Sequence, residues 1–537
     1  MNTNFKFFIY LCFIFTYLLI GAINLPLFET TEGRYSEIAR EMVVNNNYLE
    51  PTLNGIKHFH KPPLSYWGMA LGMKLFGIND FGVRFFGIVF AILAIVATYL
   101  TAQLLNKDYE FDFCSSIVLS SSLLFLICSR IVSTDIYLAS FTMMATYFLF
   151  KQIFYNKSLT NALLYAVFLA LGFLTKGPVI FIFTLLPYLV CKSFLKDHRR
   201  VFNTKEILLS FLCFLIIALP WYIYIVIKNP GLLSYFIENQ TIERIATEKF
   251  HRNEPIYFFI FIFIVTFIPY IIHFIKGIFN LNQFTYNIKI LYLYILIPLL
   301  FFSLIKSKLA TYILPFYGLA SIVSCYSISI DRRKFFKTLS YCFLLLLNVG
   351  AIVSFTIKFD IKNESTTLHI LLGLWLISIV IMALLYFILY ERFLFNTSLS
   401  ILIFVFCACS LLPYVGDEFK SYKTLTHKLN KIDPERKYEV IVYNSFIPSI
   451  SFYRNKLSIM AFSKERETQF ENNDSYKKYY INDTTTLKNL ISREKEFFLV
   501  IRPKELSNMK TIYNIECSLV AEQKKHSAYL CLTQKDY

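Results

Sequence analysis

The sequence predicts a polytopic α-helical membrane protein that carries a soluble α/β domain at its C-terminus. Of its 537 residues, 56% are hydrophobic and 17% are charged, whereas a soluble protein has about 45–50% apolar and about 25% charged residues. Its mean hydropathy is +0.52, and stretches such as Phe211–Ile227 and Ile401–Leu412 are apolar on every face. Apolar runs of about 20 residues are long enough to cross a bilayer. After about Gly416 the composition becomes that of a soluble domain.

About thirteen segments meet the length requirement for a membrane span. They lie near residues 5–23, 82–104, 113–130, 132–153, 160–175, 177–195, 207–228, 254–277, 286–305, 308–327, 335–357, 367–390 and 396–415. No small-residue cleavage site follows the first span, so we interpret it as a retained anchor. Residues 1–415 are therefore expected to form a membrane domain and residues 416–537 a separate domain.

Charge in the short loops predicts the orientation. Lys and Arg are concentrated in alternate loops, such as 192–205 and 332–337, and cytoplasmic loops carry this excess. The N-terminus is then cytoplasmic, and an odd number of spans places the C-terminal domain outside. Two longer segments, 24–81 and 229–253, also lie outside. Each is expected to contain a helix on the membrane surface, at Thr31–Val44 and Gly231–Phe250.

The C-terminal segment has the pattern of a small α/β domain. The expected elements are strands at Glu439–Tyr443 and Phe497–Ile501, a helix at Thr486–Ser492, and a hairpin of Ile515–Val520 and Ala528–Thr533. Cys517 and Cys531 fall on the two strands of that hairpin, so they are candidates for a disulfide if the domain lies outside the cytoplasm. The other cysteines lie in or beside apolar spans, where they act as small hydrophobic residues.

Several function classes are excluded by the composition and motifs. The formal net charge is +17, but in a membrane protein such an excess marks cytoplasmic loops and anionic lipid headgroups rather than nucleic acid. The sequence contains no CxxC or Cys/His zinc spacing, and no glycine pattern of a P-loop or Rossmann nucleotide site. Neither a nucleic-acid partner nor a nucleotide cofactor is expected.

Two charged segments follow the first span directly. They are Glu29–Tyr35 and His58–Leu64, and they bring acids, an arginine, histidines and a lysine to a membrane boundary. Charged groups at that depth are costly unless they bind something, so they indicate a functional site. Cations suit a lipid phosphate, while a carboxylate handles a proton or a metal. The pattern predicts chemistry on a lipid-linked substrate.

Six motifs occur in a fixed order along the membrane part. They are Thr31–Met42 with Lys61-Pro62-Pro63 and Tyr66-Trp67, Ser133-Thr134-Asp135, Leu174–Pro178, Leu219-Pro220-Trp221, Phe302-Ser303 and Ser307–Pro315. Together they resemble the aminoarabinose transferase family, bacterial membrane glycosyltransferases related to protein O-mannosyltransferases. The resemblance covers about residues 1–415, while the C-terminal domain resembles the family's periplasmic domain only by position and class.

The resemblance implies a GT-C-type architecture in the bacterial inner membrane, with the active site and C-terminal domain on the periplasmic side. It implies inverting transfer of a sugar from a polyprenyl (undecaprenyl) phosphate to lipid A, and therefore a role in lipopolysaccharide modification. In the best-known members the sugar is 4-amino-4-deoxy-L-arabinose. We expect a monomer whose partners are the lipid-linked donor, the acceptor and the membrane.

The leaving lipid phosphate gains negative charge, which preplaced cations would stabilise. The candidate cations are Arg34, Lys61, Lys176, Arg252 and Lys308. Tyr35 and Tyr312 are candidate substrate contacts, and Asp135 is a candidate for orienting a lysine or the acceptor. The alternative for each lysine is snorkelling to the interface, and the alternative for Asp135 is a helix N-cap.

The sequence departs from the family pattern at two positions. The family's Asp-Glu pair appears here as Thr31-Glu32, and the glutamate of its Phe-Glu-Lys-Pro segment appears as His60. Glu32 or Glu29 is then expected to serve as the catalytic carboxylate. His60 and His251, with Glu32, would suit zinc; alternatively, the two histidines donate hydrogen bonds to phosphate and no metal is bound.

Other readings of the sequence remain open. The acceptor could instead be a protein or O-antigen, and the sugar is not specified by the motifs. A transporter or flippase of lipid-linked sugars would place polar groups near the bilayer midplane and show repeats, whereas here the charges gather on one face. A non-catalytic binder of polyprenyl phosphate would account for the missing aspartate.

Overall fold

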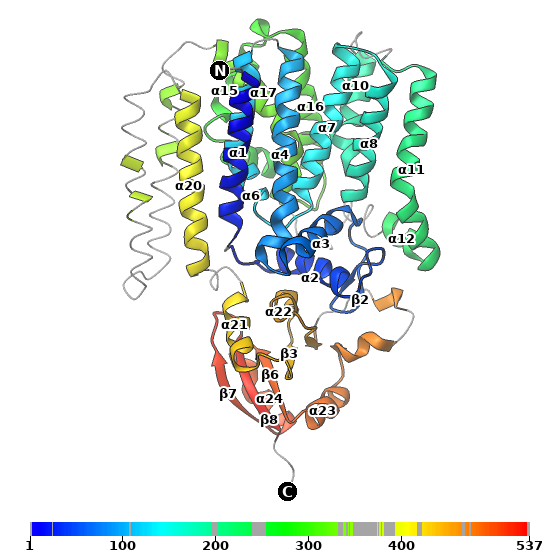
Figure 1. Cartoon of the computed structure of the whole chain (residues 1–537), viewed down its shortest axis with the longest axis vertical. Helices are drawn as coiled ribbons and strands as arrows, with labels where there is room; N and C mark the ends of the chain where they lie inside the picture. The colour runs from blue at the N-terminus through cyan, green and yellow to red at the C-terminus, as the bar shows by residue number, and fades with distance from the viewer. Residues whose placement is uncertain are drawn as a thin grey trace. The chain divides into compact units, whose positions relative to one another are not determined.

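The computed structural model describes residues 3–23, 25–106, 109–194, 201–238, 254–330, 393–415, 421–463, 468–471 and 474–533, with a few more between 337 and 380. The chain divides into two compact units. The first holds Met1–Gly21 and Gly87–Leu411, and the second holds Ala22–Phe86 and Leu412–Tyr537. The segment after the first span is therefore in the same unit as the C-terminal domain (Figure 1).

The first unit is helical. Its helices, including α4, which begins in the second unit, are α1 (Thr3–Ala22), α4 (Asp80–Leu105), α5 (Tyr109–Ser121), α6 (Leu123–Cys128), α7 (Asp135–Phe154), α8 (Leu159–Lys176), α9 (Val179–Phe183), α10 (Leu185–Phe194), α11 (Thr204–Lys228), α12 (Leu232–Ile237), α14 (Phe258–Thr266), α15 (Ile271–Phe279), the 3-10 turn η3 (Leu281–Gln283), α16 (Tyr286–Leu304), η4 (Ala310–Phe316), α17 (Tyr317–Ile330) and α20 (Phe393–Val415). Among the described residues, 6 helices are long and apolar enough to cross a membrane, or up to 7 if a bent pair counts as one span.

A multi-span helical protein is therefore confirmed, but the number of about thirteen spans is not. The predicted span 113–130 is divided between α5 and α6 at Ser122, and 177–195 is divided between α9 and α10. The span 254–277 forms α14 and α15, which meet at 115°. Pro269 lies in that break, where it has no N–H to continue a helix. The predicted spans 335–357 and 367–390 lie largely outside the described residues.

Close packing fixes the interior of the helical unit. α7 packs against α8, α8 against α11, and α5 against α17. Gly318 on α17 has no room for a side chain, because a Cβ there would lie 2.6 Å from Thr98 Oγ1 and 2.7 Å from the Met143 side chain. The absence of a side chain at this position lets α17 approach α4 and α7.

The second unit begins with α2 (Thr31–Val44), the hairpin strands β1 (Thr52–Leu53) and β2 (Ile56–Lys57), and α3 (Leu64–Phe76). Its C-terminal part contains α21 (Lys423–Ile432), β3 (Glu439–Tyr443), α22 (Pro448–Arg454), β4 (Ile459–Ala461), η8 (Thr468–Phe470), η9 (Asp474–Lys478), β5 (Tyr480–Ile481), α23 (Thr484–Arg493), β6 (Glu496–Ile501), η10 (Pro503–Glu505), α24 (Leu506–Tyr513), β7 (Ile515–Ala521) and β8 (Ser527–Thr533). The strands form one sheet in the order β5-β4-β3-β6-β8-β7. The first four are parallel, while β8 is antiparallel to both neighbours.

Alternating side chains of the sheet build two cores. Val440 and Val442 of β3 belong to a core with residues of α21 and α22, while Ile441 belongs to another with residues of α23 and α24. This period of two gives a sheet with helices on both faces. The predicted α/β domain is confirmed. Cys517 and Cys531 are register partners on β7 and β8 and form a disulfide.

The helix predicted at Thr31–Val44 is present with those bounds, but it does not have a polar face turned to solvent. Nine of its residues are buried, and the helix packs against α3 and α22. Its acids are buried because each finds a partner inside the unit. Glu37 pairs with Arg40 at 2.6 Å, and Glu41 accepts hydrogen bonds from Thr52 Oγ1 and from the backbone N–H groups of Asn54 and Gly55.

Candidate active site

Glu29 lies in the charged segment Glu29–Tyr35, and one of its carboxylate oxygens has no hydrogen-bond partner among the described residues. Its Oε1 accepts the backbone N–H of Ser449 at 2.8 Å. Its Oε2 is buried and has no hydrogen-bond partner among the described residues. Burial raises the pKa of Glu29 to about 7, against the opposing effects of Ser449 and Arg34. A carboxyl group with this pKa exchanges a proton near neutral pH, as a general base must.

Gly33 makes room for that carboxylate. A Cβ at position 33 would lie 2.4 Å from Glu29 Oε1 and 2.8 Å from Oε2, so any side chain there would displace the group. This close approach explains why the Glu32-Gly33-Arg34 motif has a glycine at its centre. It permits a carboxylate four residues earlier to fold back over the first turn of α2.

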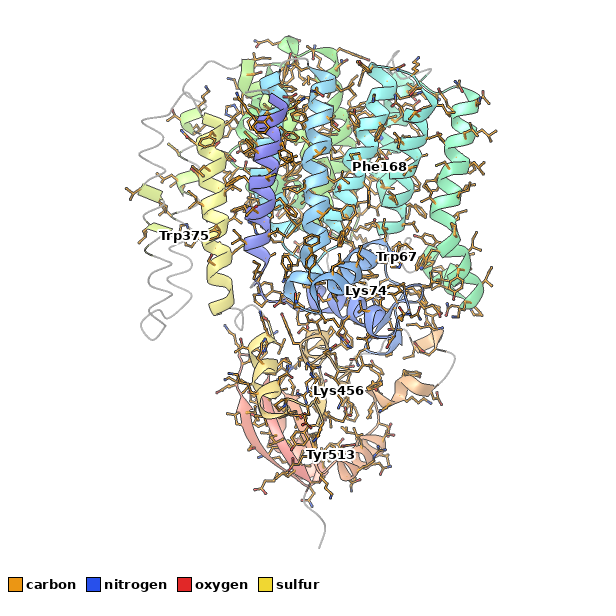
Figure 2. The ribbon with its side chains drawn as sticks, viewed as in Figure 1. Trp67, Lys74, Phe168, Trp375, Lys456 and Tyr513 are labelled. Carbon is orange, nitrogen blue, oxygen red and sulfur yellow. A yellow bond between two sulfur atoms is a disulfide. The ribbon has the colours of Figure 1, made fainter. Side chains whose placement is uncertain are left out.

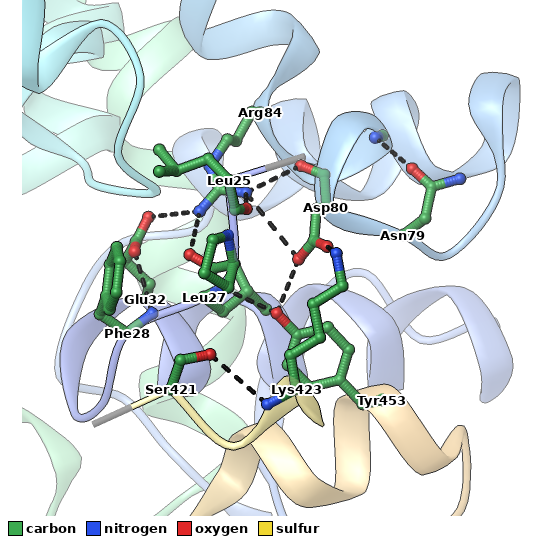
Figure 3. A network of polar contacts seen from close by, with 12 residues as sticks. Leu25, Leu27, Phe28, Glu32, Asn79, Asp80, Arg84, Ser421, Lys423 and Tyr453 are labelled. Atoms are coloured by element: carbon green, nitrogen blue, oxygen red, sulfur yellow. Dashed lines mark hydrogen bonds and ion pairs between the residues drawn. The ribbon is translucent and has the colours of Figure 1, made fainter. Parts of the chain in front are cut away.

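Glu32, the first candidate from the sequence, is instead held in an ion pair. Its Oε1 accepts a hydrogen bond from Arg84 Nη2 at 3.0 Å, and its Oε2 accepts the backbone N–H of Phe28 at the same distance. Both side chains are almost fully buried. Figure 3 shows Arg84 reaching from α4 to Glu32 and to the carbonyl of Leu25. Glu32 thus fixes the segment that leads into α2.

A polar network around Asp80 was not expected from the sequence. Asp80 accepts the hydroxyl of Tyr453 at 2.7 Å and lies 2.7 Å from Lys423 Nζ (Figure 3). Arg84 Nη1 lies 3.9 Å from the same carboxylate. Arg84 could have been found by its position, because a charge near the start of an apolar span indicates a partner. The two partners of Asp80 could not, since Tyr453 and Lys423 come from the far end of the chain.

Arg34 and Lys61 are half-buried. Arg34 lies near Glu29 and forms no ion pair with an acid that the structure describes. Lys61 lies just before α3. In the first turn of α3, the ring of Tyr66 meets the ring of Tyr35 of α2 edge to face, with centroids 5.6 Å apart. Further along α3, Trp67 donates a hydrogen bond to the carbonyl of Tyr48, and Lys74 lies over the Tyr48 ring (Figure 2). These contacts tie α3 to α2 and to the loop that follows it.

The predicted metal ligands are not assembled within the described residues. His60 is half-buried and its ring lies 4.1 Å from the ring of His58. In the part of the chain that the structure describes, no three His, Cys, Asp or Glu side chains lie close enough to hold a metal ion. His251 lies outside the described residues, so zinc binding stays a prediction.

In the helical unit, Asp135 and Lys176 form a buried ion pair. Asp135 begins α7, Lys176 ends α8, and Thr311 of η4 donates a hydrogen bond to Asp135 Oδ2 at 3.0 Å. Lys176 Nζ lies 4.5 Å from the centre of the Tyr312 ring. Three separate motifs of the sequence therefore meet in one cluster. Asp135 thus pairs with a lysine, and Thr134 rather than Asp135 is the N-cap residue of α7.

Lys308 is also buried, and its Nζ donates a hydrogen bond to the carbonyl of Glu254 at 2.8 Å. Burial lowers its pKa. A buried lysine with a backbone partner is not snorkelling to water, so that alternative does not fit this position. Arg252 lies outside the described residues and keeps its role as a prediction.

Comparisons with known proteins find relatives in sequence and in fold. The sequence model of the dolichyl-phosphate-mannose-protein mannosyltransferase family matches residues 6–236. An undecaprenyl phosphate-alpha-4-amino-4-deoxy-L-arabinose arabinosyl transferase of Proteus mirabilis is 28% identical over 70% of each chain. An uncharacterized Aquifex aeolicus protein is 26% identical over 80% of this chain and 82% of its own. The crystal structure of ArnT from Cupriavidus metallidurans bound to undecaprenyl phosphate has a TM-score of 0.82 at 16% identity, covering 99% of this chain and 98% of its own.

The helical fold, the ordered motifs and these relatives define a polytopic membrane glycosyltransferase. In sequence, the chain is similar to the aminoarabinose transferases and, over residues 6–236, to the protein mannosyltransferases. The resemblance seen in its motifs is thereby confirmed.

Proposed function

We propose that this protein transfers a sugar from a polyprenyl phosphate, such as undecaprenyl phosphate, to lipid A, and that Glu29 is the general base. The observation that carries the proposal is the state of Glu29: buried, with Oε2 unpartnered among the described residues and a pKa raised to about 7. The relatives named as arabinosyl transferases support the donor. Glu29 would replace the family's aspartate, whose position is Thr31 here.

The proposed transfer needs no nucleotide, because the lipid phosphate is the leaving group. An acceptor hydroxyl attacks the anomeric carbon while the bond from that carbon to the lipid phosphate oxygen breaks, which inverts the configuration. Glu29 Oε2 takes the hydroxyl proton, and the leaving phosphate keeps the bonding electrons. Arg34 and Lys61 are assigned to that phosphate, because fixed cations stabilise charge as it forms. For Asp135 and Lys176 of the helical unit, the substrate-binding roles expected from the sequence are kept as part of the proposal.

The location proposed for this reaction is the periplasmic face of the bacterial inner membrane. The Cys517–Cys531 disulfide supports a C-terminal domain outside the cytoplasm, because disulfides persist in oxidising compartments. The excess of basic residues in alternate loops supports the same orientation. We also propose that the protein acts as a monomer.

The test is mass spectrometry of lipid A and total glycolipids from cells that lack the protein or express the wild type or Glu29→Gln. We expect a sugar-sized mass on lipid A with the wild type alone. A matched control is Glu435→Gln, which changes an exposed carboxylate of the same unit and should retain the product. Unchanged lipid A with an altered glycan or glycoprotein would redirect the acceptor to O-antigen or protein.

A second measurement separates the enzyme from a flippase. Purified protein in detergent, with no membrane to cross, should convert the donor and acceptor to product. Failure to form product in detergent, together with donor movement across vesicles, would favour transport. Binding of the donor without either activity would identify a non-catalytic relative.

A further inference from the structure

A cavity of about 640 Å³ lies within the second unit, and none of its lining residues is assigned to transfer. One side of its lining comes from the segments that adjoin α1 and α4, and includes Ile23, Ile78 and Phe81. The other side comes from the C-terminal domain and includes Lys423, His427 and Arg436. Apolar and basic side chains thus line the same cavity.

The apolar side stands where two candidate spans begin and end. Ile23 follows α1 directly and is 49% exposed, while Phe81 is in the first turn of α4. Both α1 and α4 are long and apolar enough to cross a membrane. An opening bordered by these residues is therefore at the depth where lipid headgroups meet acyl chains.

The cavity's own acid, Asp80, pairs with one basic side chain, Lys423, and leaves the charge of Arg436 without an ion pair among the described residues. Asp80 also lines the cavity, but it is already bound by Lys423 at 2.7 Å and by the Tyr453 hydroxyl at 2.7 Å. Both His427 and Arg436 are exposed. Burial and Lys423 lower the pKa of His427, while Asp80 raises it, so His427 contributes mainly a hydrogen-bond donor. Lys423 and His427 are four residues apart on α21, so they lie on the same face of that helix.

We propose that this cavity binds the phosphate headgroup of an anionic membrane lipid, with Lys423, His427 and Arg436 as hydrogen-bond donors and Ile23, Ile78 and Phe81 against its acyl chains. The combination of cations with an apolar border at the membrane boundary is the chemistry of such a lipid. This inference goes beyond the transfer reaction, because it uses none of the residues assigned to catalysis. It identifies a second lipid site in the same protein.

The proposal is tested by lipid binding to the full-length protein in detergent, measured by native mass spectrometry with phosphatidylglycerol and with phosphatidylcholine. We expect phosphatidylglycerol to bind preferentially, and Arg436→Gln and His427→Gln each to weaken its binding several-fold, about fivefold for the arginine. The matched control is Lys428→Gln, which removes one positive charge from the same helix outside the cavity lining. It should leave binding unchanged.

Three outcomes would overturn the assignment. Equal losses in Arg436→Gln and Lys428→Gln would show that surface potential alone attracts the lipid. Equal binding of phosphatidylcholine would remove the role of the anionic headgroup. Displacement of the lipid by millimolar inorganic phosphate would assign the site to free phosphate instead. Because the readout is binding, a failure here leaves the proposed transferase activity untouched.

Discussion

The Glu29 carboxylate accepts the backbone N–H of Ser449 at 2.8 Å, although the two residues are 420 positions apart in the chain. Ser449 lies at the start of α22 in the C-terminal domain, and Glu29 lies just before α2. One oxygen of the proposed base is therefore held by the C-terminal domain, while the other is left for a proton. This contact gives that domain a direct part in positioning the carboxylate.

For Glu29→Gln we expect a loss of transfer of at least about a hundredfold, since general bases contribute typically 10²–10⁴-fold. Wild-type activity should rise with pH through about 7, the pKa of Glu29, and the residual activity of the variant should lose that dependence. The measurement is the pH profile of transfer by purified protein.

The stability of the folded protein should fall as pH rises, whereas its activity should rise. Folding raises the pKa of this carboxyl group, so its contribution to stability is fully present at pH values below the ordinary pKa of 4.5. The contribution is lost as pH rises from about 4.5 toward 7. Glu29→Gln, which can still accept the Ser449 N–H, should therefore be at least as stable as wild type at pH 8. A variant that is both inactive and unfolded would leave Glu29 with a structural role.

Glu32→Gln should mainly reduce stability. The substitution leaves Arg84 without its 3.0 Å carboxylate partner in a buried site, and breaking a buried pair costs about 3–5 kcal/mol. Denaturant unfolding of the detergent-solubilised protein measures the change, and Glu32→Gln/Arg84→Gln should lose less than the sum of the single variants. An unchanged unfolding midpoint with abolished transfer would return the base role to Glu32.

Arg34→Ala and Lys61→Ala should each reduce transfer about a hundredfold or more, because a lost donor at developing charge costs about 2.7–4 kcal/mol. Lys74→Ala is the matched control, since Lys74 lies on exposed α3 surface over the Tyr48 ring. Its turnover should stay near wild type. Near-normal turnover in both test variants would reduce Arg34 and Lys61 to structural residues.

His526 should make the C-terminal domain sensitive to acid. Burial, with Arg502 and Lys525, lowers its pKa from the ordinary 6.5 to about 4. The unfolded chain then binds a proton that the folded chain refuses, so stability falls by up to about 3 kcal/mol as pH drops from 6.5 toward 4. His526→Gln should flatten this loss, measured as unfolding midpoint against pH. An equally steep loss in the variant would assign the effect to other groups.

A reporter that is active only in the cytoplasm should stay silent when it is fused after Tyr537. The prediction follows from the basic residues in alternate loops, which place the C-terminus outside. Activity of the reporter would overturn the orientation, and with it the periplasmic placement of the reaction. Thiol labelling of Cys517 and Cys531 with and without reductant provides a second reading of the compartment.

Local pattern was sufficient for much of the fold. The span length and composition indicated a multi-span helical protein, the 3.6-residue period gave α2 with its bounds, and short continuous apolar runs gave β3 and β6. These features depend on neighbours in the chain, so a single sequence carries them. The motifs likewise identified the family, because short segments in a fixed order are visible without coordinates.

The tertiary structure decided which charged groups are available for chemistry. Glu29 and Glu32 look alike in sequence, but Arg84 neutralises Glu32 while burial raises the pKa of Glu29. The difference arises from desolvation and from partners far away in the chain, and neither has a local periodic signal. The meeting of Asp135 with Lys176, and of Asp80 with Tyr453, was hidden for the same reason. The sequence alone determined which residue types are present and which helices and strands they form, whereas long-range burial and pairing set their charge and reactivity.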